Sequence, residues 1–168
     1  MKKILNNLNN RKLNYGENII KDWSKSVSPQ NILDIGAGKG RDLKIFSKEN
    51  VRCNAIENYP PFIDILKKNN INVLNLDLEK NSFPFRDESL DLIIANQILE
   101  HCKEIFWIHH EIFRTLSIGG NIIIGVPNLA SYYNRIALLF GLQPYCITLD
   151  SAHVRGFTKK GYISFLNN

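Results

Sequence analysis

The chain has 168 residues, of which 44% are hydrophobic and 22% are charged, so it is long enough and apolar enough for one globular domain with a sizeable core. Its three cysteines are an odd number and lie far apart in the sequence, which argues against a disulfide framework and favours a reducing compartment. The net charge of +5 comes from lysines that are spread along the chain, so we do not expect a nucleic-acid partner.

Residues 1–27 form a polar stretch whose pattern predicts an amphipathic helical lead-in. The opening Met-Lys-Lys resembles the start of a secretory signal, but Asn6, Asn7, Asn9 and Asn10 follow where the apolar region of a signal should be. No apolar stretch approaches the length of a membrane span, so the sequence predicts a cytoplasmic protein.

Segments typical of strands and of helices alternate over residues 31–126. This alternation predicts an α/β fold of the Rossmann-like kind, whose parallel strands bind ligands beyond their carboxyl ends. Strands are expected at 31–35, 51–56, 72–76, 90–95 and 121–126, and helices at 39–49, from Pro60 onward and at 103–117, the last ended by Gly119 and Gly120.

The strongest functional signal is the run from Asp34 to Gly40, in which three alternating glycines connect the first strand to a helix. Glycines let a ligand approach the backbone closely, and amides at the start of a helix favour an anionic group. The alternative is a plain tight turn. A dinucleotide fingerprint would place its third glycine one position later. That spacing, together with Arg41 and the acidic residue ahead of the glycines, disfavours NAD.

Acidic residues follow the next two predicted strands, where they could meet a nucleoside. Glu57 comes directly after the second strand, and a carboxylate there can accept hydrogen bonds from both ribose hydroxyls. Asp77 follows the third strand and could accept from an adenine amino group, while the amide of Leu78 could donate to the ring. The alternatives are an exposed acid at a strand end for Glu57 and an Asx-turn residue for Asp77.

The stretch 95–101 follows the fourth predicted strand and should face the reacting centre. It contains two polar candidates, Asn96 and His101. The alternative is a loop before a helix, in which Ile98 and Leu99 serve only to pack.

In this order, these motifs resemble those of the class I S-adenosylmethionine-dependent methyltransferases, in the small-molecule group described as type 11 or type 23 methyltransferase domains. The resemblance covers roughly residues 28–128 and implies S-adenosylmethionine as the cofactor. By this resemblance, Asp34, Gly36, Gly38 and Gly40 cradle the methionine portion, Glu57 holds the ribose, Asp77 and Leu78 hold the adenine, Asn96 lies beside the sulfonium, and Ala37 and Asn58 are further cofactor-binding residues.

The reaction implied by the resemblance needs few catalytic groups. A sulfonium methyl is already activated, so its transfer mainly requires alignment and exclusion of water. His101 is the candidate general base if the acceptor is a poor nucleophile, against the alternative of a packed or capping histidine. We interpret His109 and His110 as structural, and no spacing in the sequence predicts a metal site. The run 58–62 resembles the signature of amino-group nucleic-acid methyltransferases, but it follows the wrong strand.

The last part of the chain is apolar but has no further strand pattern. Residues 129–140 predict a helix that is either a lid lining an acceptor pocket or a packed cap, and Thr158 could cap a final helix over 159–166. His153 has no role that the sequence assigns.

The sheet is therefore expected to have five parallel strands in the order 3-2-1-4-5, without the sixth and seventh strands that the family normally has. The fifth strand would be an apolar edge, which pairs readily with another chain. Either residues 129–158 cover this edge, or a homodimer forms through it, or the shortened chain has reduced stability.

The sequence thus predicts a single domain over 1–168, with a lead-in at 1–27, a cofactor-binding core at 28–128 and a cap at 129–168. The expected function is methyl transfer from S-adenosylmethionine to a small-molecule acceptor, which the apolar cap suggests is lipid- or saccharide-linked. The first alternative is a cofactor-binding module without turnover, and the second is a nicotinamide-dependent reductase.

Overall fold

A computed structural model describes residues 16–48 and 50–167, and its centre is a five-stranded sheet. Every pair of neighbouring strands is parallel, and the order β3-β2-β1-β4-β5 confirms the order expected from the sequence. The strands are β1 (Asn31–Ile35), β2 (Arg52–Ile56), β3 (Asn72–Leu74), β4 (Leu90–Asn96) and β5 (Leu116–Gly125).

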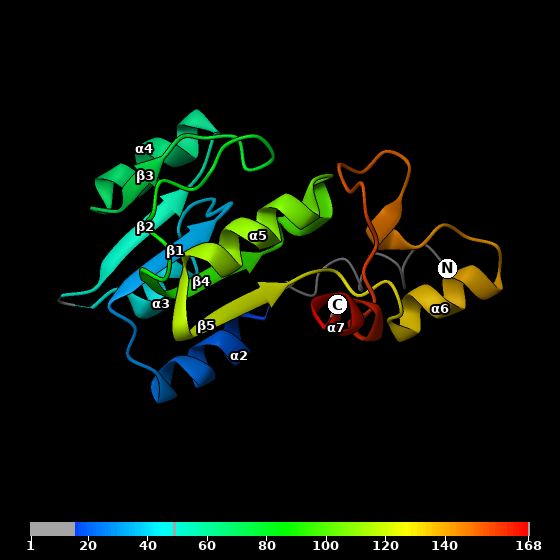
Figure 1. Cartoon of the computed structure of the whole chain (residues 1–168). Coiled ribbons are helices and arrows are strands. Elements are labelled where there is room, and N and C mark those ends of the chain that lie inside the picture. Colours follow the sequence, from blue (N-terminus) through cyan, green and yellow to red (C-terminus); the bar gives the residue numbers. More distant parts are fainter. Residues whose placement is uncertain (1–15, 49, 168) are drawn as a thin grey trace.

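Helices connect β1 to β2, β2 to β3 and β4 to β5, and further helices follow β5 (Figure 1). No helix in 16–48 or 50–167 combines the length and hydropathy needed to cross a membrane. Of the predicted lead-in, residues 1–15 lie outside the described part of the chain. The α-helices are α2 (Glu17–Trp23), α3 (Leu43–Phe46), α4 (Pro60–Lys68), α5 (Ile105–Thr115), α6 (Tyr132–Leu139) and α7 (Lys159–Leu166), and the 3-10 helices are η1 (Ser24–Ser26), η2 (Leu99–His101) and η3 (Tyr145–Ile147).

β1 and β4 lie at the centre of the sheet, and their side chains alternate between its two faces. Leu33 and Ile93 join the core beneath α5 and α7, whereas Ile32 and Leu92 join the core on the side of α2, α3 and α4. None of these four side chains is exposed to solvent. Because both faces are covered, the central strands are apolar without a polar face, as the sequence pattern predicts.

The predicted helix at 39–49 is wrong in its extent. Turns occupy residues 38–42, and only Leu43–Phe46 forms α3. Gly40 has a φ of +73°, which is outside the helical region, and Ser47 is already extended. The predicted third strand is likewise shorter, because β3 ends at Leu74.

The predicted helix at 103–117 ends earlier, and the two glycines do not end it. The chain leaves α5 at Thr115 and enters β5 at Leu116. The β4–β5 register then shifts between Leu90 and Leu92, which leaves Gly119 and Gly120 in a bulge. The glycines therefore allow the backbone of the strand to form the bulge, in which Gly119 has a φ of +79°.

Three asparagines form a side-chain ladder across neighbouring strands near their amino ends. The side-chain amide of Asn72 donates to the side-chain oxygen of Asn54 at 2.9 Å. The side-chain amide of Asn54 in turn donates to Asn31, and to the Ile32 carbonyl, at 3.0 Å each. These bonds link β3, β2 and β1 through side chains in addition to the backbone ladder.

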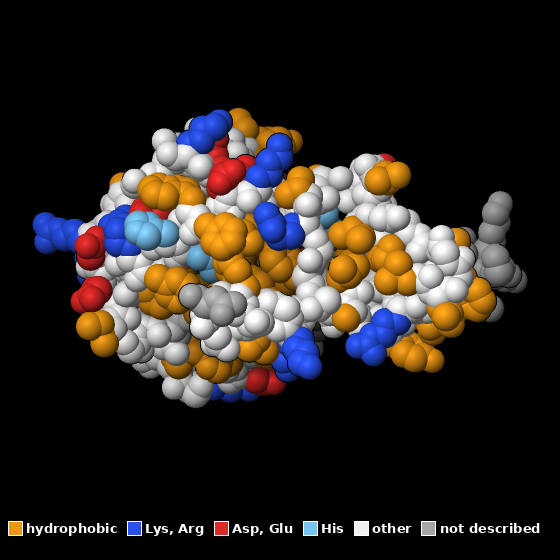
Figure 2. All heavy atoms as spheres, turned by 45° about the vertical axis from the view of Figure 1, so that its right-hand side comes forward, with side chains coloured by type: hydrophobic (Ala, Val, Ile, Leu, Met, Phe, Trp, Pro, Cys, Tyr) orange, Lys and Arg blue, Asp and Glu red, His pale blue; other side chains and the backbone are white. Residues whose placement is uncertain are grey.

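The cap that follows β5 lies beyond the carboxyl end of that strand rather than along its edge (Figure 1). It is attached by a bridge between Asn128 and Phe157, and Thr158 caps α7 as predicted by accepting from the Gly161 amide. Residues 129–140 contain the expected helix, α6, but the packed-cap alternative does not describe it, because Tyr132 is 81% exposed and Leu139 is 80% exposed. Figure 2 shows hydrophobic side chains over this part of the surface.

A buried ion pair holds the loop before β4 against α5. The Glu111 carboxylate is buried and accepts from the Phe83 amide at 2.6 Å and from the Arg114 guanidinium at 2.7 Å. Arg114 also donates to the Phe83 and Phe85 carbonyls and pairs with Asp87, whose side chain is exposed. The guanidinium lowers the pKa of Glu111, so this stabilisation is present at neutral pH and is lost as the pH falls through the folded pKa.

We expect Glu111→Ala to lower the free energy of unfolding by about 2–4 kcal/mol, because it removes the buried charged partner of Arg114 and leaves the buried Phe83 amide without its acceptor. Asp87→Ala is the matched control, since it removes the exposed partner of the same Arg114 and should cost less than about 1 kcal/mol. Urea unfolding of both variants measures the difference. Equal losses would contradict the assigned role of Glu111.

Candidate functional site

The glycine loop lies at the carboxyl end of β1 and is pinned to the end of β2. The amides of Gly36 and Ala37 both donate to the Ile56 carbonyl, at 2.9 and 3.3 Å. Gly36, Gly38 and Gly40 have φ values of +67°, +56° and +73°, which glycine adopts without strain. The alternating glycines of the sequence are thus required by the backbone conformation itself.

The three glycines differ in what surrounds them. A Cβ at Gly36 would lie 2.6 Å from Cδ1 of Ile98, and one at Gly40 would lie 2.8 Å from Cδ2 of Leu66. A Cβ at Gly38 would have no atom within 4 Å. Close packing therefore restricts the first and third positions, whereas the second faces open space that a ligand could occupy.

The Glu57 carboxylate accepts hydrogen bonds from backbone amides of the glycine loop and of the segment after β2. One carboxylate oxygen accepts from Gly38 at 2.8 Å, and the other accepts from Asn58 at 3.0 Å and from Tyr59 at 2.9 Å. Glu57 is 9% exposed and is therefore not the solvent-exposed acid of the alternative interpretation. A carboxylate has about four acceptor positions, so one remains for a further donor.

A buried polar cluster lies beside the loop, on the face of the sheet toward α3. Asp34 is 3% exposed and Asp42 is 5% exposed. Asp42 accepts from the Asn96 side chain at 2.7 Å and pairs with Arg41. Burial, and then the charges of Asp42 and Glu57, raise the pKa of Asp34 well above its ordinary value. The cluster thus concentrates acidic groups where β1, β2 and β4 end.

The sequence analysis did not single out Asp42. The residue lies two positions after the glycine loop, inside the segment expected to be a helix, and there an acid has no distinctive pattern. In the structure α3 begins only at Leu43, and Asp42 lies in the turn before it, where its side chain is buried.

Asp77 and Leu78 lie beyond the end of β3, where the sequence placed them. Asp77 accepts from the Glu79 amide at 3.0 Å and pairs with Lys80 at 2.9 Å, so it forms the Asx turn of the alternative interpretation. Its side chain nevertheless remains 45% exposed, and Leu78 packs against the core. Asp77 therefore stays accessible to a ligand that reaches the end of β3, and Leu78 is partly buried beside it.

The end of β4 has a constrained backbone. Gln97 follows the strand with a φ of +61° and donates its amide to the Gly125 carbonyl at 2.7 Å. A Cβ at Gly125 would collide with the side-chain oxygen of Asn96. The Asn96 side chain therefore fits into the buried cluster because the neighbouring strand has a glycine at position 125. No local sequence pattern indicates this need for a glycine.

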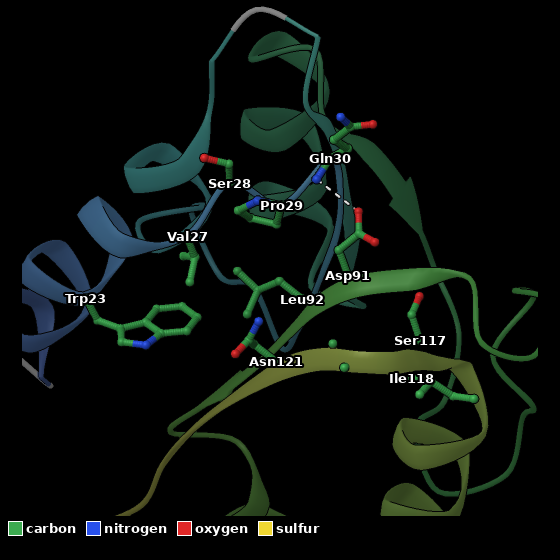
Figure 3. Close-up of a pocket in the computed structure, with 12 residues that line it drawn as sticks. Trp23, Val27, Ser28, Pro29, Gln30, Asp91, Leu92, Ser117, Ile118 and Asn121 are labelled. Carbon is green, nitrogen blue, oxygen red and sulfur yellow. Dashed lines mark hydrogen bonds between the residues drawn. The ribbon is translucent and has the colours of Figure 1, made fainter.

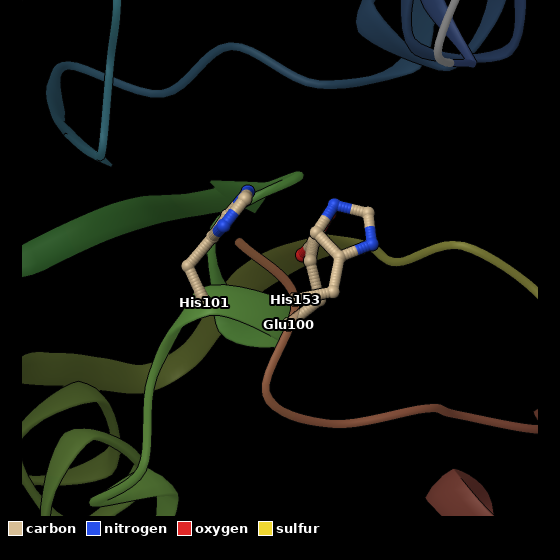
Figure 4. Close-up of side chains that lie close together, drawn as sticks. All are labelled: Glu100, His101 and His153. Carbon is tan, nitrogen blue, oxygen red and sulfur yellow. The ribbon is translucent and has the colours of Figure 1, made fainter. Parts of the chain in front are cut away.

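The fold brings three residues together that the sequence analysis did not connect. Glu100 and His101 end η2, and His153 lies in the segment between η3 and α7 (Figure 4). The two imidazole rings are 4.7 Å apart at their centroids. His109, by contrast, is buried and bonded to the Tyr162 hydroxyl, which confirms its structural role.

A hollow of about 430 Å³ lies at the opposite end of the sheet. Figure 3 shows its walls, which come from the η1–β1 connection and from the start of β5. Its one acidic side chain, Asp91, accepts the amides of Gln30 and Asn31 at 2.9 Å each and thereby ties β4 to the entry of β1. The buried polar cluster and the glycine loop lie at the carboxyl ends of the strands and not at this hollow, so we place the functional site at the carboxyl ends.

The family model for a methyltransferase domain matches residues 33–124, which are more than half of the chain. An uncharacterised protein of Methanocaldococcus jannaschii is 31% identical over 104 residues, which make up 62% of this chain and 48% of that protein. The chain thus spans about half the length of this curated relative.

Solved methyltransferases share the fold. A SAM-dependent methyltransferase from Archaeoglobus fulgidus is 18% identical, with a TM-score of 0.68, covering 89% of this chain and 66% of the other. A protein from Thermotoga maritima described as a possible histamine N-methyltransferase is 18% identical, with a TM-score of 0.65, covering 98% and 76%. At these identities the likeness concerns the fold alone.

We expect Asp34→Asn to gain stability relative to the wild type as the pH rises. The folded state retains a proton on Asp34 that the unfolded chain releases near the ordinary pKa of 3.8, so the contribution of Asp34 is complete below pH 3.8 and is lost as the pH rises toward the folded pKa. Urea unfolding of both proteins from about pH 4 to about pH 8 measures this difference. Parallel profiles would contradict it.

Proposed function

Because the chain belongs to the class I S-adenosylmethionine-dependent methyltransferase family, we propose that it transfers the methyl group of S-adenosylmethionine to a small-molecule acceptor. The assignment of individual residues, the acceptor and the assembly state are part of this proposal. So is the division of the chain into a cofactor-binding core at 28–128 and a cap at 129–168.

The observation that supports the proposal most directly is the buried acidic cluster of Asp34, Asp42 and Glu57. S-adenosylmethionine has positive charge on its sulfonium and on its ammonium group. Burial, and then repulsion from Asp42 and Glu57, raise the pKa of Asp34, and a cation beside the carboxylates would favour their charged form. The residues present therefore fit this cofactor, and they fit the doubly anionic pyrophosphate of NAD poorly.

Each predicted cofactor contact has a position consistent with the role we propose for it. The open side of Gly38 admits the methionine portion, and the remaining acceptor position of Glu57 suits a ribose hydroxyl. In full, we propose that Asp34, Gly36, Ala37, Gly38 and Gly40 surround the methionine portion, that Glu57 and Asn58 meet the ribose, that Asp77 and Leu78 meet the adenine, and that Asn96 lies beside the sulfonium.

The methyl group is supplied already activated on a sulfonium, so the work of the chain is to orient the donor and to exclude water. Asn96 and Asp42 form a hydrogen-bonded pair that fixes the floor of the site. His101 is the candidate for accepting a proton from the acceptor. Its Nδ1 lies 3.2 Å from the Ala152 carbonyl, which leaves Nε2 as the basic atom.

For the acceptor, we propose a lipid- or saccharide-linked small molecule. Its support is the cap, where Tyr132, Leu139 and Phe140 are exposed beyond the carboxyl end of β5. A binding module without turnover is the second candidate.

Calorimetry with S-adenosylmethionine and with NADH, followed by transfer of a labelled methyl group into a cell extract, tests the proposal. We expect binding of S-adenosylmethionine alone and a labelled small-molecule product. Binding without any labelled product would favour the module without turnover, and binding of NADH alone would contradict the proposal.

We expect Glu57→Ala to weaken S-adenosylmethionine binding about ten- to hundredfold, because hydrogen bonds to a charged group contribute about 1.5–3 kcal/mol. Asp64→Ala is the control, since it removes an exposed carboxylate from the same side of the sheet. Calorimetry gives the two affinities, and thermal unfolding separates lost contacts from a loosened loop. An unchanged affinity in Glu57→Ala would remove this residue from the site.

The β5 edge suits a homodimer, because among residues 16–48 and 50–167 β5 has a strand neighbour only on its β4 side. We expect sedimentation equilibrium to give twice the chain mass of 19.3 kDa. In that case Ile123→Lys, a substitution within β5, should shift the mass toward the monomer. A monomer at all concentrations would contradict pairing through this edge.

A further inference from the structure

We propose that Glu100, His101 and His153 form a binding site for a divalent transition metal of the zinc class. One ligand atom from each residue lies within 4.8 Å of the others. Two of the residues belong to η2, directly after β4, and the third comes from the segment after η3 (Figure 4). This site uses none of the methyl-donor contacts proposed above, but it shares His101 with the candidate general base, and a metal on Nε2 of His101 would replace that role.

Hydrogen bonds prepare both imidazoles to bind a metal. Nδ1 of His101 lies 3.2 Å from the Ala152 carbonyl, and Nδ1 of His153 lies 2.7 Å from the Cys146 carbonyl. A carbonyl oxygen only accepts, so each Nδ1 must carry the hydrogen. The Nε2 atom of each neutral ring therefore keeps its lone pair. Metal-bound histidines in proteins are oriented by such a bond from their second nitrogen.

Glu100 supplies an observation that is independent of the histidines. Its side chain is 1% exposed, and its Oε2 atom has no hydrogen-bond partner among the described residues. A buried carboxylate oxygen without a partner is costly, and a bound cation would satisfy it. The alternative is an edge-to-face contact between two histidine rings, which would explain their spacing of 4.7 Å but leaves this oxygen unexplained.

The donor set indicates which metal fits. Two imidazole nitrogens and one carboxylate match the three protein ligands of zinc sites that keep a fourth position open. Imidazole favours zinc, cobalt and nickel over magnesium and calcium, which prefer oxygen donors. His101 is exposed, so the open position can be reached from solvent.

The metal would connect two segments that few other bonds hold together. The Val154 amide donates to the Glu100 carbonyl at 2.8 Å, and Arg155 donates to the Lys103 carbonyl at 3.2 Å. A metal bound by Glu100, His101 and His153 would fix the 148–158 segment against η2. We therefore expect metal binding to order the cap as well as to occupy the site.

The test uses chelator-treated full-length protein without any methyl donor, so that its outcome is independent of methyl transfer. Zinc is titrated by calorimetry, and cobalt is added as a spectroscopic probe. We expect one metal per chain and a visible cobalt spectrum of a site with nitrogen and oxygen donors. His153→Ala, His101→Ala and Glu100→Gln should each weaken zinc binding at least about 100-fold, since removing even an outer-shell partner costs about 10- to 100-fold.

His110→Ala is the matched control, because His110 is an exposed histidine of α5 that lies outside the cluster. It should bind zinc like the wild type. Circular dichroism and thermal unfolding of the metal-free variants establish that they fold. The proposal is overturned if the wild type binds no zinc, or if the folded variants bind it as the wild type does. A thiolate-to-cobalt charge-transfer band would also overturn it, because a cysteine would then be a ligand.

Discussion

The structure depends on the burial of β1 between β2 and β4, with helices covering both faces of the sheet. Parallel neighbours bring the carboxyl ends of these strands to one edge, and the loops that leave them must turn within a few residues. At the end of β1 this turn requires glycines with positive φ, and at the end of β4 it forces Gln97 into a left-handed conformation. The polar groups of the candidate site lie close together because they follow strands that are neighbours in the sheet.

This edge of the sheet is electrostatically unfavourable in the isolated chain. Asp34 and Asp42 are almost completely buried there, and the repulsion between them contributes to the raised pKa of Asp34. Arg41 offsets part of this repulsion by pairing with Asp42, but burial still favours the neutral form of Asp34. The protein therefore gives up stability at the place where a cationic ligand would restore it, which is how binding sites commonly differ from the rest of a core.

Much of this arrangement could be predicted from the sequence, because the signals are local. The apolar run of β1, the glycine loop and Glu57 each follow from a short pattern whose spacing fixes its place on the sheet. What could not be predicted depends on distant contacts. The burial of Asp42 depends on Asn96, and the place of Asn96 depends on the missing side chain of Gly125. The proximity of His101 and His153 follows only from the path of the cap. Gly119 and Gly120 were expected to end a helix but lie in a strand bulge, because glycine is common in both places.

The asparagine ladder of Asn31, Asn54 and Asn72 has a consequence for how the sheet assembles. Parallel strands come from separate parts of the chain, so a newly formed pair has several competing alignments. A slip by one residue would turn the buried amide of Asn54 toward the opposite face and leave it without both side-chain partners. Misaligned strand pairs would thus be less stable than the correct pair as soon as they form. Polar residues at the amino ends of these strands would then select the correct alignment during folding, at the end of the sheet opposite to the one where ligands are expected to bind.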